Sequence, residues 1–146
     1  MIQIRNEQKS DYQIVEDITR EAFFLPKYQR IGYGKLLMEH SFKRAVELGY
    51  DTIVIFGSPA NYVSRGFKSC KKYNLCVEGG GYPAGMLAKE LKEGAFDGRK
   101  WIYSGSPVMD VDEQEAIRFD DALPPMAKEY RPSQDEFYII SQAFLG

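Results

Sequence analysis

The sequence predicts a mixed α/β fold in which a sheet is flanked by helices. A basic, glycine-bearing turn at residues 29–34 leads into an amphipathic segment that ends at Gly49, as expected for a helix with a glycine stop. The next segment, residues 51–57, contains four consecutive apolar side chains and is typical of a strand buried on both faces. Helix followed by strand in this order also fits a βαβ crossover.

Composition narrows the class of protein. The 146 residues are 44% hydrophobic and 27% charged, which is ordinary for one globular domain. The formal net charge of −2 gives no reason to expect a nucleic-acid partner. Apolar runs all fall short of the ~20 residues of a membrane helix, so we expect a soluble, cytoplasmic protein without a membrane partner. Cys70 and Cys76 suit no zinc site, and we expect free thiols and no metal.

The N-terminal segment predicts a strand and then a helix. Residues 2–5 alternate apolar and polar side chains, which predicts a short strand. Ser10 and Gln13 have the spacing of a capping box, which predicts a helix over residues 11–23. The core-facing stripe of that helix would consist of Ile14, Val15, Ile18 and Ala22.

The helix after the glycine turn has two distinct faces. Its apolar side would consist of Gly34, Leu37, Met38, Ser41, Ala45 and Leu48. The opposite side would carry an exposed ladder of alternating charges, made by Lys35, Glu39, Lys43 and Glu47. His40, the single histidine, lies toward the polar side without an evident acidic partner, so we assign it no catalytic role.

The middle of the chain predicts short elements. Ser58-Pro59 starts a short helix that continues to about Arg65, and a strand over residues 67–70 follows. Residues 73–77 are expected to extend that hairpin. Residues 78–83, EGGGYP, form a turn, and residues 86–91 are expected to be the last strand of the sheet.

The C-terminal part predicts an edge strand and two helices. The strand covers residues 101–103. Asp112 with Glu115 caps a helix that extends to about Asp121. A second helix is expected to be capped by Ser133 and Glu136, with an apolar stripe of Phe137, Ile140 and Phe144.

The turn at residues 29–34 predicts an anion site. Where a strand end and a glycine turn precede a helix, unpaired backbone N–H groups and the helix dipole converge. Gly32 and Gly34 allow a ligand to approach the backbone and tolerate positive φ. A Walker-type loop would need G-x-x-x-x-G-K-[ST], which this turn lacks. A dinucleotide fold would need a third glycine where Leu37 stands.

Gln29-Arg30-x-Gly32-x-Gly34 resembles the Q/R-x-x-G-x-G/A motif of the GCN5-related N-acetyltransferases (GNAT), which cradles the pyrophosphate of acetyl-CoA. The preceding residues 25–28, LPKY, resemble the lead-in at the end of that family's fourth strand. Residues 61–67, NYVSRGF, resemble the segment after its fifth strand. The resemblance covers roughly residues 1–92 and implies an acetyl-CoA-dependent N-acetyltransferase that transfers acetyl directly to an amine.

The resemblance also implies a set of donor-site residues. Backbone N–H groups from Arg30 to Lys35 would face the pyrophosphate, and a backbone N–H of Phe24 or Leu25 would polarise the thioester carbonyl. Asn61 would contact the pantetheine arm, unless it only forms a turn. The cofactor-binding set is therefore Phe24, Leu25, Gln29, Arg30, Ile31, Gly32, Tyr33, Gly34, Lys35 and Asn61.

Tyr62 stands where many family members carry a general acid. A phenol stays protonated at neutral pH and can donate a proton to a departing thiolate. The alternative interpretation is that Tyr62 packs among the chain's many aromatic side chains. A general base is not identified, although Glu21, Asp51 and Glu78 are possible.

The chain departs from the family pattern between Phe23 and Phe24, where the family carries its central strands. The resemblance therefore implies a truncated acetyltransferase core over residues 1–92 and an extension over residues 93–146, packed on the core or on a partner subunit. Missing strands leave unpaired edges, so we expect a homo-oligomer, and a dimer in particular. The alternative function is a non-catalytic CoA-binding or structural remnant of an acetyltransferase.

Overall fold

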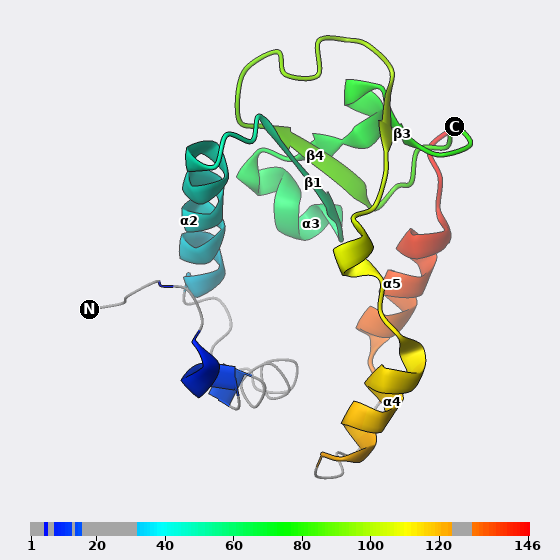
Figure 1. The fold of residues 1–146 in the computed structure, drawn as a ribbon. Helices are drawn as coiled ribbons and strands as arrows, with labels where there is room; N and C mark the ends of the chain where they lie inside the picture. The colour runs from blue at the N-terminus through cyan, green and yellow to red at the C-terminus, as the bar shows by residue number, and fades with distance from the viewer. Residues whose placement is uncertain (1–4, 6–7, 13, 16–31, 124–129) are drawn as a thin grey trace. The chain divides into compact units, whose positions relative to one another are not determined.

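The computed structural model describes residues 5, 8–12, 14–15, 32–123 and 130–146 (Figure 1). The chain divides into two compact units, residues 1–50 and 51–146. The described residues form helices and two small β-sheets, which confirms the mixed α/β class. The predicted strand at residues 2–5, apart from Arg5, and most of the predicted helix over residues 11–23 lie outside the described residues.

In the first unit, a short 3₁₀ helix, η1 (Lys9–Asp11), begins two residues earlier than the predicted helix. The Asp11 carboxylate accepts the Gln8 N–H at 2.9 Å and is held by both Arg5 guanidinium nitrogens, at 2.6 and 2.9 Å. These bonds, those from Arg5 above all, hold the pKa of Asp11 at about 2. The prediction that Ser10 caps this segment is therefore wrong, because a charged carboxylate supplies the stronger cap.

Helix α2 (Tyr33–Glu47) follows the glycine turn, and Gly49 with φ of 85° provides the predicted stop. No residue of α2 is buried, and Leu37 and Leu48 from its predicted apolar side are 56% and 57% exposed. The charge ladder forms in part. Lys35 pairs with Glu39 at 3.7 Å, but Glu47 pairs with Arg44 at 3.0 Å instead of Lys43.

The second unit contains the sheets. Its described elements are β1 (Thr52–Phe56), α3 (Pro59–Tyr62), η3 (Val63–Arg65), β2 (Lys68–Ser69), η4 (Cys70–Tyr73), β3 (Leu75–Val77), β4 (Met86–Glu90), β5 (Trp101–Tyr103), η5 (Pro107–Met109), α4 (Glu113–Asp121) and α5 (Pro132–Gln142). One sheet has the order β1-β4-β2 and is antiparallel, and the other pairs β3 with β5 in parallel.

Two predictions about these strands are corrected. Residues 73–77 do not extend the β2 hairpin, because β3 pairs with β5. Strand β4 is, as predicted, the last strand of its sheet in chain order, and it lies at the centre of that sheet. Strand β1 is not buried on both faces: residues 52–55 are half-buried and Phe56 is 55% exposed, since β4 is its only neighbour among the described strands.

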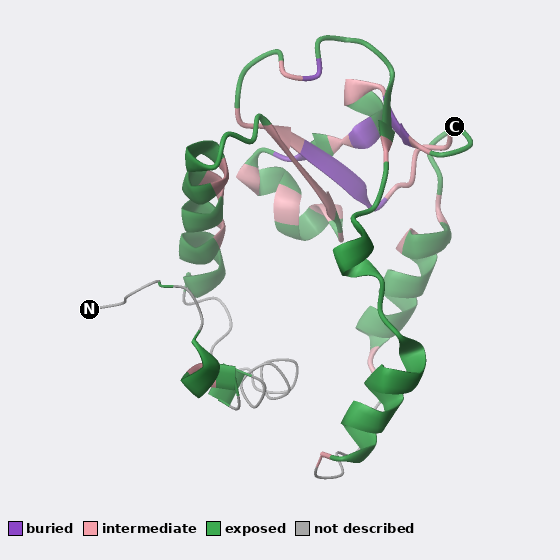
Figure 2. Ribbon diagram, viewed as in Figure 1, coloured by how far each residue is buried: buried purple, intermediate pink, exposed green. Residues whose placement is uncertain are grey.

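The core of the second unit lies along β4 and β3, as the purple segments of Figure 2 show. Met86 and Ala88 of β4 cluster with Cys70, Leu75 and Phe96, and all five are buried. Both cysteines are buried free thiols, as predicted. Burial raises the pKa of the Cys70 thiol above its ordinary value, which makes this sulfur less reactive.

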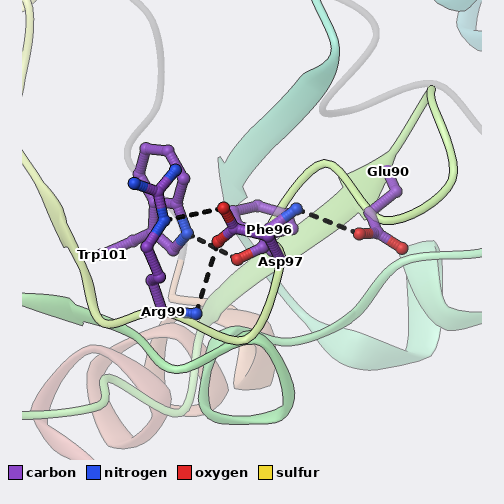
Figure 3. Close-up of polar contacts among 5 residues, drawn as sticks. All are labelled: Glu90, Phe96, Asp97, Arg99 and Trp101. Atoms are coloured by element: carbon purple, nitrogen blue, oxygen red, sulfur yellow. Dashed lines mark hydrogen bonds and ion pairs between the residues drawn. The ribbon is translucent and has the colours of Figure 1, made fainter.

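The loop from β4 to β5 is fixed by polar contacts at its two ends (Figure 3). The Glu90 carboxylate accepts the Phe96 N–H at 3.1 Å, and the Trp101 indole donates to the Phe96 carbonyl at 2.7 Å. The Phe96 ring stacks on Tyr73 with centroids 4.5 Å apart. The loop therefore brings β5 beside β3, although 23 residues of sequence separate the end of β3 from the start of β5.

Of the two caps predicted for the C-terminal helices, the cap of α4 is confirmed and the cap of α5 is wrong. Asp112 caps α4 as predicted and accepts N–H bonds from Gln114 and Glu115 at 2.8 and 3.0 Å. The Ser133 cap is wrong. Helix α5 starts at Pro132, whose fixed φ suits the first helical position, and the Gln134 side chain accepts the Arg131 N–H at 2.9 Å.

The end of the chain docks on the turn before β4. Ala84 N–H donates to the Ala143 carbonyl and Leu145 N–H to the Tyr82 carbonyl, each at 2.8 Å. Phe144, between these two bonds, lies over Gly81 and outside α5. The predicted stripe is therefore not a buried face: Phe137 is 70% exposed, and Ile140 is half-buried.

Replacing Gly81 by alanine should release this tail. A Cβ at Gly81 would lie 2.8 and 2.9 Å from two ring carbons of Phe144, and crowding of this kind costs about 1–3 kcal/mol. We expect the Leu145 and Ala84 amides to exchange faster with deuterium in Gly81→Ala. Gly105→Ala is the matched control, because no atom lies within 4 Å of its Cβ position. Equal exchange in both variants would contradict the docking.

Candidate functional site

The predicted site residues fall in both units, and each group is described by itself. Gly32, Tyr33, Gly34 and Lys35 belong to the first unit, and Asn61 and Tyr62 belong to the second. The remaining predicted donor-site residues lie outside the described residues: Phe24, Leu25, Gln29, Arg30 and Ile31.

The start of α2 has the geometry of a glycine-initiated helix. Gly32 is the N-cap residue with φ of 92°, in the left-handed region that favours glycine. Its carbonyl accepts the Leu36 N–H at 3.2 Å, and no side chain of Gly32 can cap the helix. The N–H groups of the first helical turn, residues 33–35, therefore have no acceptor within the helix. The expected positive φ is found at Gly32, whereas Gly34 is helical.

The space around this turn is open among the described residues. No atom lies within 4 Å of the Cβ position of Gly32 or of Gly34. Tyr33 is 48% exposed, and the Lys35 side chain is 54% exposed. The Lys35–Glu39 pair at 3.7 Å is a surface pair, so it holds the ammonium group only weakly. Within the described residues nothing accepts the N–H groups of residues 33–35, so the α2 start can present these groups, a helix dipole and one cation to an anion.

Tyr62 is the last residue of α3, a short helix whose length is limited by the residues on either side of it. Pro59 occupies the first turn of α3, and Gly66 with φ of 86° ends the 3₁₀ turn that follows. The Tyr62 side chain is half-buried. Its ring packs edge-to-face against Phe67 with centroids 5.8 Å apart, and it lies against Gly57. Within the described part of the chain, no hydrogen bond reaches its hydroxyl.

Asn61 and the possible bases have simpler surroundings. The Asn61 N–H donates to the Ser58 carbonyl at 3.0 Å, which closes the turn, and its side chain is exposed. Asp51 contributes its backbone carbonyl, which accepts the Leu91 N–H at 2.9 Å. Glu78 is exposed beside the glycine turn that follows β3, and Glu21 lies outside the described residues.

Two residues that contact the Tyr62 segment, Lys89 and Gly57, were not predicted from the sequence. Lys89 donates from its ammonium group to the Arg65 carbonyl at 2.9 Å and so caps the end of the turn that follows Tyr62. The sequence offers one signal for the role of Lys89, namely a charged side chain directly after the three apolar residues that begin β4. Gly57 makes the close approach to the Tyr62 ring, and a glycine at the end of a strand gives no comparable signal.

The described residues offer neither a metal site nor a membrane-spanning helix. They contain no group of three or more histidine, cysteine, aspartate or glutamate side chains that could hold a metal ion. Among the described helices, none combines the length and the apolar composition needed to cross a membrane.

No family model matches this chain, and no curated protein matches it. Among solved structures, the chain is similar to a GNAT family N-acetyltransferase, YhbS from Escherichia coli, in a 1.55 Å crystal structure in complex with CoA. The identity is 25%, the match covers 53% of this chain, and the TM-score is 0.48. The match extends over 43% of that protein, so this chain corresponds to less than half of its length.

Proposed function

We propose that this chain is an acetyl-CoA-dependent N-acetyltransferase that transfers acetyl directly to an acceptor amine. One observation carries the proposal: a basic Q-R-x-G-x-G turn runs into a helix whose first N–H groups are open, at a left-handed Gly32 and an unobstructed Gly34. The geometry of the α2 start fits an approaching pyrophosphate, because no side chain of the described residues occupies the space beside either glycine.

The donor would be held chiefly by the backbone. N–H groups of residues 33–35 would bond the pyrophosphate oxygens, aided by the roughly +0.5 charge of the helix N-terminus. Lys35 would add a full charge, and we assign Arg30 and Gln29 to the same task. Asn61 would contact the pantetheine arm. Acetyl-CoA, as co-substrate, supplies the activated acetyl group.

The transfer step needs a polarised carbonyl and a proton for the leaving group. A backbone N–H of Phe24 or Leu25 would bond the thioester oxygen as charge develops on it. The acceptor nitrogen attacks the carbonyl carbon, so that a C–N bond forms while the C–S bond breaks. The thiolate takes its proton from the Tyr62 hydroxyl, and the proton lost by the amine restores the phenol through solvent. The products are an N-acetylated amine and free CoA.

Replacing Gly34 by leucine tests the donor site. Leucine is a better helix former than glycine and the space at Gly34 is open, so the thermal midpoint should not fall. The new side chain should block the approach of the ligand and weaken CoA binding by about tenfold or more, or ~1.4 kcal/mol, in isothermal titration. Gly105→Leu is the control and should bind like the wild type. Equal affinities for all three proteins, or no wild-type binding at millimolar CoA, would contradict the assignment.

Replacing Tyr62 by phenylalanine tests the acid. The ring and its packing remain while the proton is lost, so kcat should fall by about 10²-fold and the Kd for CoA should not change. Tyr138→Phe alters a 65% exposed tyrosine and should have wild-type kinetics. Unchanged turnover in Tyr62→Phe would remove Tyr62 from the mechanism. Wild-type protein that binds CoA but acetylates no amine in a broad panel would favour the non-catalytic alternative.

We further propose that the protein functions as a homodimer in the cytoplasm. Exposed apolar side chains on α5 support this proposal: Phe137, Tyr138 and Ile139 are each at least 65% exposed, which is unusual for a monomer surface. Multi-angle light scattering at micromolar concentration should give twice the mass of one chain. A monodisperse species of 16.7 kDa would contradict the proposal.

A further inference from the structure

We propose that Gly57 is a positioning residue for Tyr62: the missing side chain at Gly57 makes room for the phenol ring and sets where its hydroxyl lies. The inference rests on the proposed function of Tyr62 as the acid. It adds a second residue, outside the resemblance to any motif, on which the proton transfer would depend.

The Tyr62 ring lies unusually close to Gly57. A Cβ placed on Gly57 would lie 2.7 Å from Cε2 of Tyr62, 3.4 Å from Cδ2 and 3.6 Å from Cζ. The first distance is closer than carbon atoms approach without repulsion, since contacts between carbons are optimal near ~3.5–4.0 Å. The edge of the ring that carries the hydroxyl therefore fills the space that any larger residue at position 57 would need.

The backbone at position 57 does not itself require glycine. Seven glycines of the described residues have positive φ, and Gly57 is not among them. An alanine could therefore adopt this backbone conformation without strain. The close approach of the Tyr62 ring is what sets the residue type at this position.

Gly57 and the far side of the Tyr62 ring are both held in place by neighbouring residues. The Gly57 N–H donates to the Gly85 carbonyl at 2.9 Å and extends the β1–β4 ladder beyond Phe56. Phe67, which meets the Tyr62 ring edge-to-face at an interplanar angle of 73°, is 2% exposed. Its N–H donates to the Tyr62 carbonyl at 3.4 Å. A Cβ at position 57 would thus displace the ring, because the sheet and the buried Phe67 do not yield as easily.

Gly57→Ala measures the consequence. A displacement near 1 Å of a catalytic group can cost about 10²-fold in rate, so we expect kcat to fall by about that factor. The KM for acetyl-CoA should stay near that of the wild type, because the N–H groups proposed to bind the pyrophosphate belong to α2 and the Asn61 side chain is exposed. Gly105→Ala is the matched control, with open space at its Cβ position and no positive φ, and it should keep wild-type kinetics.

A double substitution separates positioning from general damage. In the Tyr62→Phe background the hydroxyl is gone, so adding Gly57→Ala should reduce kcat no further. A multiplicative second loss would overturn the inference, because Gly57 would then act through something other than the Tyr62 hydroxyl. A wild-type kcat in Gly57→Ala would overturn the inference about Gly57 but would leave the proposed acetyltransferase function unaffected. Absence of any wild-type turnover would overturn the proposed function first, and with it the catalytic consequence of Gly57.

A measurement on the wild type keeps the inference testable if Gly57→Ala does not fold. Nuclear Overhauser effects should connect the Tyr62 ring protons to the Gly57 α-protons and to the Phe67 ring. Their presence supports the arrangement independently of any reaction. A well-resolved Tyr62 ring without contacts to Gly57 would overturn the inference.

Discussion

The antiparallel ladder between β1 and β4 is the interaction on which the second unit depends. It continues past both strand ends, since the Asp51 carbonyl accepts the Leu91 N–H at one end and Gly57 N–H donates to Gly85 at the other. From β4 it directs Met86 and Ala88 into the core. On the other face Lys89 reaches the carbonyl that ends η3. The hydrogen bond from Gly57 to Gly85 also fixes the position of Gly57. In our proposal, Gly57 in turn determines where the Tyr62 ring lies.

The two parts of the proposed site depend on different physics. The α2 start needs a backbone conformation, left-handed at Gly32, and empty space beside Gly34. Tyr62 needs packing, which Phe67 and the gap at Gly57 provide. A substitution can therefore damage one part and spare the other. This separation of binding from proton transfer is what makes the catalytic and the CoA-binding alternatives distinguishable.

Local sequence patterns predicted the elements that form within a few residues. They failed where a cap or a strand pairing depended on a distant residue or on a competing side chain. Residues 51–57, the turn at Gly66 and the Asp112 cap were predictable because apolar runs, glycine and a carboxylate act over a few residues. Both misplaced caps had a stronger competitor nearby, Asp11 in one case and Gln134 with Pro132 in the other. The pairing of β3 with β5 depends on a loop fixed through Phe96, which no periodicity of two short strands encodes. The Gly57–Tyr62 contact likewise arises only when the turn closes.

In the proposed mechanism, the start of α2 binds the pyrophosphate of acetyl-CoA. Titration of ¹⁵N-labelled protein with acetyl-CoA, followed by amide chemical shifts, tests it most directly because every residue reports separately. We expect saturable shifts at the amides of Tyr33, Gly34 and Lys35, whose N–H groups lack helical acceptors. Unshifted amides at these three residues at millimolar acetyl-CoA would contradict it, whatever shifts appear elsewhere in the chain.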